Sequence, residues 1–85
     1  MEIILNQEVN LVNGIRTNMI ELREPTPRDL LNLSNINQLE FKEITLISNL
    51  TTIDIESIKD MPMKDYKKIQ NALETYYKDE AISPK

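Results

Sequence analysis

Apolar and polar residues alternate along the first 23 positions, and this period of two predicts a half-buried β-hairpin. Asn13 and Gly14 stand at its centre, and both residue types tolerate the positive φ that a two-residue type I′ turn requires. A hairpin over residues 3–23 around that turn places Leu5 opposite Leu22. Its apolar face needs a cover of helices, because an isolated pair of strands is only marginally stable in water.

A helix start signal follows the hairpin. Thr26 suits the N-cap, Pro27 suits the first helical position, and Asp29 brings a carboxylate to the free N–H groups of the first turn. The apolar spacing from Leu30 to Leu33 and beyond predicts a short helix of at most about three turns. Thr26 and Asp29 are therefore expected to be structural residues.

A second helix is predicted over residues 38–50, and its apolar residues spread too widely for one buried stripe. The residues on one line of this helix are Leu39, Leu46 and Leu50. Phe41 and Ile44 lie about 140–200° from that line on a helical wheel. Either the helix is sandwiched between two layers of a small core, or its second side is kept for a partner.

A short helical turn from Asp54 to Asp60 and a last helix from Pro62 to about Lys78 complete the predicted elements. The last helix carries an apolar stripe formed by Met63, Tyr66, Ile69, Leu73, Tyr76 and Tyr77. The predicted core contains Leu5, Leu22, Leu30, Leu33, Ile47 and Leu73. The predicted fold is α+β, with an N-terminal β-hairpin followed by three main α-helices and a short helical turn. We expect one domain over residues 1–78 and a flexible C-terminal tail over residues 79–85.

Composition narrows the function. The chain has 85 residues, and 10 Lys and Arg against 14 Asp and Glu give a net charge of −4. Cysteine and histidine are absent and glycine occurs once, which excludes a thiol nucleophile, a Cys/His zinc site and a glycine-rich phosphate loop. The acidic balance argues against a nucleic-acid partner, and no apolar run is long enough for a membrane span. Carboxylates alone form no recognisable nucleophile–base pair, so we expect no enzyme, cofactor or metal.

By elimination the protein acts through its surface. The partner face predicted on the second helix has Phe41 and Ile44 as apolar anchors and Glu40 on its rim. Tyr76 and Tyr77, at the end of the last helix, are a further candidate, because tyrosine combines apolar area with a polar tip. The free edges of the hairpin are a third candidate surface, since the unpaired backbone groups of an edge strand can bind a further strand.

The order of these elements resembles a known family. The most specific stretch runs from Leu22 to Leu30 and has the pattern Leu-Arg-x-Pro-x-x-x-Asp-Leu. Joined to the hairpin and to the later helices, it resembles the small tail assembly chaperones of contractile-tailed and Mu-like phages, the relatives of the P2-type E protein. The resemblance extends over residues 9–77. Thr51-Thr52 stands where a Thr-Gly pair is common in that family, and Tyr76-Tyr77 replaces a terminal Phe.

The resemblance implies a non-catalytic protein of the host bacterial cytoplasm that is absent from the mature virion. Such proteins bind the long, helical tape measure protein, keep it soluble, and help the tail tube protein to polymerise around it. Association with a second copy of the chain stays open. The alternative is a small phage or bacterial regulatory inhibitor, of the antitoxin or anti-defence type, that masks one folded protein target. A net charge of −4 is modest for such an inhibitor and favours the chaperone.

Overall fold

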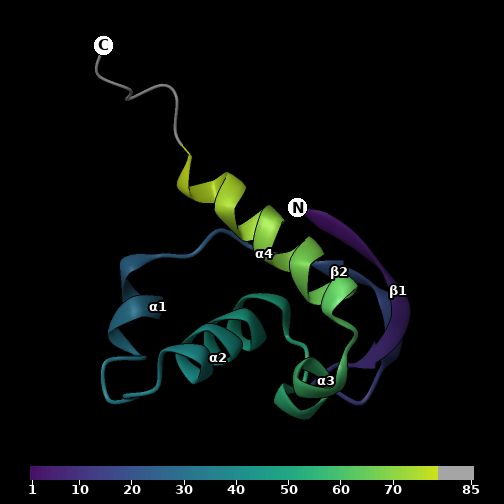
Figure 1. Ribbon diagram of the computed structural model, residues 1–85, viewed down its shortest axis with the longest axis horizontal. Coiled ribbons are helices and arrows are strands. Elements are labelled where there is room, and N and C mark those ends of the chain that lie inside the picture. Colours follow the sequence, from purple (N-terminus) through teal and green to yellow (C-terminus); the bar gives the residue numbers. More distant parts are fainter. Residues whose placement is uncertain (79–85) are drawn as a thin grey trace.

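Two strands are followed by four helices within residues 1–78, the part of the chain that the computed structural model describes (Figure 1). In order, the elements are β1 (Glu2–Asn10), β2 (Arg16–Glu21), α1 (Pro27–Leu31), α2 (Leu39–Thr51), α3 (Ile55–Asp60) and α4 (Met63–Tyr77). An antiparallel hairpin followed by helices confirms the α+β prediction. The tail predicted for residues 79–85 lies outside the described residues.

The helices cover one face of the hairpin. α4 and α3 pack against β1, and α2 packs against β2 and α3. α1 lies at the opposite end of the molecule from the hairpin, beside α2 (Figure 1). None of the helices in residues 1–78 combines the length and the apolar character that crossing a bilayer requires.

The hairpin turn differs from the predicted type I′ turn. The amide of Gly14 donates to the carbonyl of Leu11 at 2.9 Å, and the amide of Leu11 donates to the carbonyl of Ile15 at 2.8 Å. Of the two central residues, Gly14 alone has a positive φ, of 92°. This is a three-residue loop in which glycine takes the left-handed position. The predicted pairing of Leu5 with Leu22 is therefore wrong.

A bulge in β1 shifts the register a second time. Four residues of β1 lie between the paired positions Ile4 and Val9, whereas Asn18 alone lies between their partners on β2. The amides of Asn6 and Gln7, in the bulge, donate to the two carboxylate oxygens of Asp65 at 2.7 and 3.1 Å. Asp65 stands in the first turn of α4 and is fully buried. It holds β1 to α4.

The apolar face predicted for the hairpin is nevertheless the buried one. The buried apolar residues of the two strands and the segment after them are Ile3, Leu5, Val9, Ile20 and Leu22. The helices and their linkers complete the core with Leu33, Leu46, Ile47, Leu50, Ile53, Ile58, Ile69, Ala72 and Leu73. Five of the six predicted core residues are in this set. Leu30 is the exception, since it is 52% exposed.

The end of α2 is tied to the hairpin through a strained residue. Thr52, at the C-terminal end of the helix, has φ 62° and ψ 16°, the left-handed conformation that usually belongs to glycine. Its carbonyl accepts the amide of Val12 at 2.8 Å, and Leu11 and Ile53 form an isolated antiparallel bridge beside it. The departure at Thr51-Thr52 therefore falls on a position where the backbone favours glycine.

Replacing Thr52 with Gly is expected to raise the free energy of unfolding by about 1 kcal/mol, because glycine adopts this conformation without a Cβ clash. Urea unfolding measures the change. Thr52→Ala is the matched control, since alanine keeps the Cβ and most of the strain. A glycine variant no more stable than the alanine variant contradicts the prediction.

Candidate functional site

An apolar groove opens between α1, α2 and the C-terminal end of α4. Its volume is about 460 Å³. Buried Leu33, Leu46 and Leu73 form its floor. Leu30, Leu39 and Tyr77 line its walls and are 52%, 77% and 57% exposed. Exposed large apolar side chains gathered around one hollow are typical of a protein–protein interaction site. We call this hollow the leucine groove.

Sequence reasoning missed Leu30 and Leu39 because it assigned both to the core side. α1 ends at Leu31, and residues 32–35 form turns rather than further helix. Leu39 is the first residue of α2 and is 77% exposed. The helical wheel shows correctly that Leu39 shares a line with Leu46 and Leu50. A helical wheel does not show where the neighbouring elements end, so it cannot show which residues on that line are covered.

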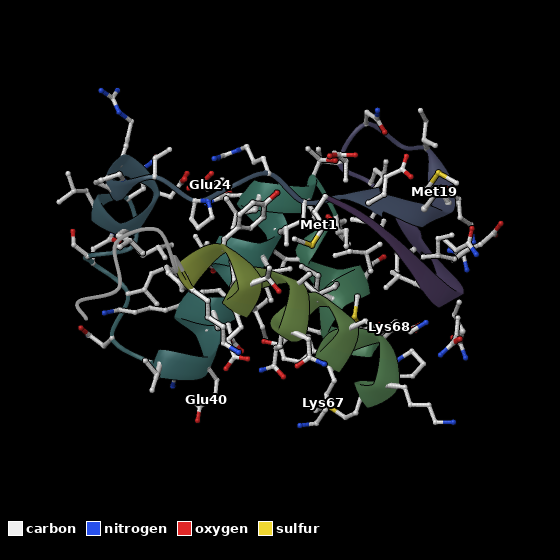
Figure 2. The ribbon with its side chains drawn as sticks, turned by 90° about the horizontal axis from the view of Figure 1, so that it is seen from above. Met1, Met19, Glu24, Glu40, Lys67 and Lys68 are labelled. Carbon is white, nitrogen blue, oxygen red and sulfur yellow. The ribbon has the colours of Figure 1, made fainter. Side chains whose placement is uncertain are left out.

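Polar residues of α2 border the leucine groove. Glu40, Lys42 and Glu43 of α2 line it, and Glu40 projects from the start of the helix (Figure 2). One carboxylate oxygen of Glu43 accepts the hydroxyl of Tyr66 at 2.5 Å and the amide of Gln70 at 3.0 Å. Burial and the Glu43 carboxylate raise the pKa of Tyr66. These bonds hold α2 and α4 together beside the groove.

The residues predicted for partner binding are divided between several surfaces. Glu40 and Tyr77 line the leucine groove. Ile44 is half-buried and lines a separate hollow of about 320 Å³ between α2, α3 and α4, which Glu40 also borders. Phe41 is 38% exposed and has the Lys59 ammonium 5.9 Å from its ring centroid.

Tyr76 differs from its neighbour Tyr77. Its hydroxyl donates to the carbonyl of Leu22 at 3.0 Å, and its ring packs against the core. Tyr76 therefore joins the end of α4 to the segment that follows β2, whereas Tyr77 turns toward the leucine groove. The two tyrosines do not form a common surface patch. Whether Phe41, Ile44, Glu40, Tyr76 or Tyr77 contact a partner stays a prediction.

An ion pair positions α1 and with it one wall of the groove. The guanidinium of Arg23 donates to both oxygens of Asp29, at 2.8 and 2.9 Å. Asp29 also accepts the amide of Thr26 at 2.7 Å and its hydroxyl at 3.1 Å. The Arg23 guanidinium and the Thr26 amide hold the pKa of Asp29 well below its usual range. The structural role predicted for Thr26 and Asp29 is seen here, but the partner Arg23 was not predicted.

Asp29→Asn is expected to lower the melting temperature at neutral pH. The melting temperature of the variant should also fall less than that of the wild type when the pH is lowered. Because the folded state lowers the pKa of Asp29, its carboxylate stabilises the fold above about pH 4, and this contribution is lost as the pH falls toward the folded pKa. The difference between the wild type and the variant should therefore shrink below about pH 4. Thermal melts from neutral to strongly acidic pH measure it, with Glu24→Gln as the exposed neighbouring control. A difference that is constant with pH contradicts the prediction.

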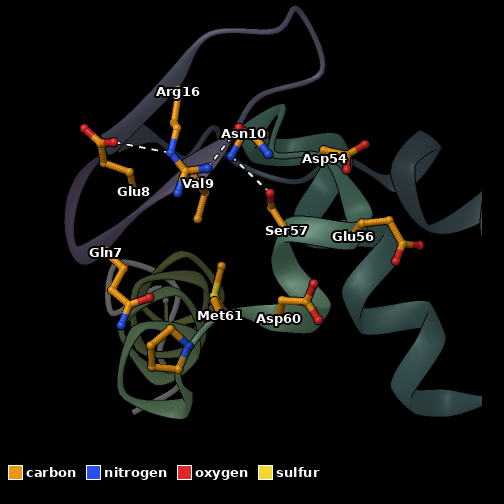
Figure 3. A pocket seen from close by; sticks show the side chains of 11 residues that line it. Gln7, Glu8, Val9, Asn10, Arg16, Asp54, Glu56, Ser57, Asp60 and Met61 are labelled. Atoms are coloured by element: carbon orange, nitrogen blue, oxygen red, sulfur yellow. Dashed lines mark hydrogen bonds and ion pairs between the residues drawn. The ribbon is translucent and has the colours of Figure 1, made fainter.

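A polar hollow of about 300 Å³ lies between β1 and α3 (Figure 3). Arg16 contacts Glu8 at 3.4 Å and donates to the side chain of Asn10 at 3.1 Å, and the amide of Asn10 donates to the Ser57 hydroxyl at 3.0 Å. Asp60 lines this hollow. Both carboxylate oxygens of Asp65 are already occupied by the backbone amides of Asn6 and Gln7. The described residues contain no group of three or more acidic side chains placed to hold a metal ion.

Comparison with known proteins gives one family. The model of the family described as "Phage tail assembly chaperone proteins, E, or 41 or 14" matches residues 2–76. No curated protein and no solved structure matches the chain. The matched region includes β1, β2, α1, α2, α3 and nearly all of α4.

Proposed function

Because the chain belongs to the phage tail assembly chaperone family, we propose that it binds apolar helices of the tape measure protein in the leucine groove. One observation carries the proposal: exposed Leu30, Leu39 and Tyr77 surround a hollow with a leucine floor. An amphipathic helix in such a groove buries its apolar stripe and gains its energy from a few anchors with a polar rim. The role is non-catalytic.

Binding of this kind keeps a long apolar helix soluble until tail tube subunits assemble around it. The proposed place of action is the host cytoplasm, and the chaperone leaves before the virion is complete. The family match favours this role over the regulatory inhibitor that the sequence also allowed.

Co-expression with the phage's own tape measure protein tests the proposal. We expect the tape measure protein to be insoluble alone, and soluble and co-purified with this chain when the two are expressed together. Soluble tape measure protein in both cultures, or insoluble protein in both, contradicts the proposed function.

A further inference from the structure

The outer edges of β1 and β2 differ in how far their outward backbone groups are already hydrogen-bonded. Along β1, the Lys68 ammonium donates to the carbonyl of Ile4 at 2.9 Å, and Asp65 binds the amides of the bulge. Further along, the amide of Asn10 donates to the Ser57 hydroxyl at 3.0 Å, and the carbonyl of Asn10 accepts the amide of Asp54 at 2.8 Å. From Ile4 to Asn10, the edge of β1 is therefore covered by α4, α3 and the linker before α3.

The edge of β2 is open at Glu21, between the amides of Met19 and Arg23, which already have acceptors. The amide of Leu22 donates to the carbonyl of Met1 at 2.8 Å, and Glu2 pairs with Glu21 in the next position of the ladder. Hydrogen-bonded and non-hydrogen-bonded pairs alternate in an antiparallel ladder, so the N–H and C=O of Glu21 point away from β1. Outward groups of this kind are a template for another strand.

An apolar hollow of about 350 Å³ lies beside this open edge. Its lining includes Met19, Ile20 and Glu21 of β2, and Leu50, Thr51 and Thr52 from the end of α2. The carbonyl of Leu50 accepts the amide of Arg23 at 3.2 Å, and that of Thr52 accepts the amide of Val12 at 2.8 Å. These bonds fix the end of α2 next to β2. Thr52 is thus part of the lining.

We propose that the open edge of β2 binds an extended segment of a partner protein, which adds as an antiparallel strand. Its backbone pairs with the N–H and C=O of Glu21, and aliphatic side chains on either side enter the hollow. The residue opposite Glu21 is basic. Glu2 and Glu21 face each other across the ladder, both exposed, with one ammonium group, that of Met1, 2.8 Å from Glu21. Two carboxylates beside one ammonium favour a further cation.

A second copy of this chain fits the edge less well. Symmetric pairing centred on Glu21 places two Glu21 side chains directly opposite each other, which is destabilising. Pairing Glu21 with Met19 of the other copy needs the Met19 amide, which already donates to the Thr17 hydroxyl at 3.1 Å. A helical partner cannot pair with this edge, because the backbone N–H and C=O groups of a helix are hydrogen-bonded to one another.

The test is an ¹⁵N NMR titration with the peptide acetyl-Thr-Val-Lys-Val-Thr-amide. The expected result is amide shifts confined to residues 19–23 and 49–52 at peptide concentrations up to about 2 mM, the range of a weak single-strand contact. The same peptide with an N-methyl group on the lysine amide lacks the donor to Glu21 and should cause no shifts. Equal shifts with both peptides, shifts confined to the leucine groove, or no shifts overturn the proposal.

Two variants separate backbone pairing from charge. Glu21→Pro removes the outward N–H without breaking the ladder, since proline is tolerated at an edge position that faces solvent. It should weaken binding about tenfold or more, the combined effect of one lost hydrogen bond and the lost carboxylate. Glu21→Gln keeps the N–H and should weaken binding about fivefold at most, as expected of an exposed charge. Equal losses in both variants contradict strand addition, as do concentration-dependent shifts at residues 19–23 without peptide, which indicate a second copy.

Discussion

Asp65→Ala is expected to lower the free energy of unfolding by about 2–4 kcal/mol, a large part of the stability of a domain this small. The carboxylate is fully buried and accepts the amides of Asn6 and Gln7 at 2.7 and 3.1 Å. Its removal leaves two backbone donors of β1 without their charged acceptor and releases the bulge from α4. Urea unfolding at neutral pH measures the loss.

Asp60→Ala is the matched control, because Asp60 is an exposed acid on the neighbouring helix α3. Its change should stay within about 0.5 kcal/mol, as for surface substitutions generally. Equal destabilisation by the two variants would mean that Asp65 acts through net charge rather than through the bulge.

Leu39→Asp is expected to abolish co-purification of the tape measure protein while leaving the melting temperature nearly unchanged. Leu39 is 77% exposed, so a charge there costs the folded monomer little. On the wall of the leucine groove the same charge must be buried when an apolar helix binds, and burying an unpaired carboxylate is strongly unfavourable. A pull-down after co-expression, with a thermal melt of the purified variant, measures both effects.

Phe41→Asp distinguishes the two candidate surfaces. Phe41 lies outside the leucine groove, beside Lys59, so this variant should fold and still bind. If Phe41→Asp folds and loses the partner while Leu39→Asp keeps it, the partner face predicted on the second side of α2 is the binding site. If Phe41→Asp unfolds, the sandwiched interpretation of α2 is correct.

The sequence predicted the order and type of every element because the local signals are strong. Thr26 and Pro27 begin α1 and Asp54 is the N-cap residue of α3, each in the position that its chemistry favours. Pro62 directly precedes α4 as its N-cap residue, one position before the first helical position that proline favours. The apolar face of the hairpin was also predictable, since alternation identifies a face even where the register is unknown.

The register was not predictable from the turn, because two separate features set it. Gly14 alone takes a positive φ, which changes the loop from two residues to three. The bulge in β1 depends on Asp65, which is 58 residues away from Gln7 along the chain. No local pattern indicates that an acid in the first turn of a distant helix will bind strand amides.

The candidate site was predicted in part. Glu40 and Tyr77 border the leucine groove, but Leu30 had been assigned to the core and Leu39 to the same line of the second helix as Leu46 and Leu50. Periodicity shows which residues share a helix face, whereas exposure depends on where the neighbouring elements end. The polar residues after Leu31, among them Asn32 and Asn35, are the one sequence signal that α1 stops too early to cover this face.

Site-specific photo-crosslinking tests the central claim most directly. Benzoylphenylalanine replaces Leu39 in one variant and Phe41 in another, and each is irradiated in complex with the tape measure protein. The leucine groove predicts that the probe at position 39 crosslinks to an apolar helical segment of the tape measure protein and that the probe at position 41 does not. Crosslinking from position 41 alone would contradict the account and place the partner on the opposite side of α2.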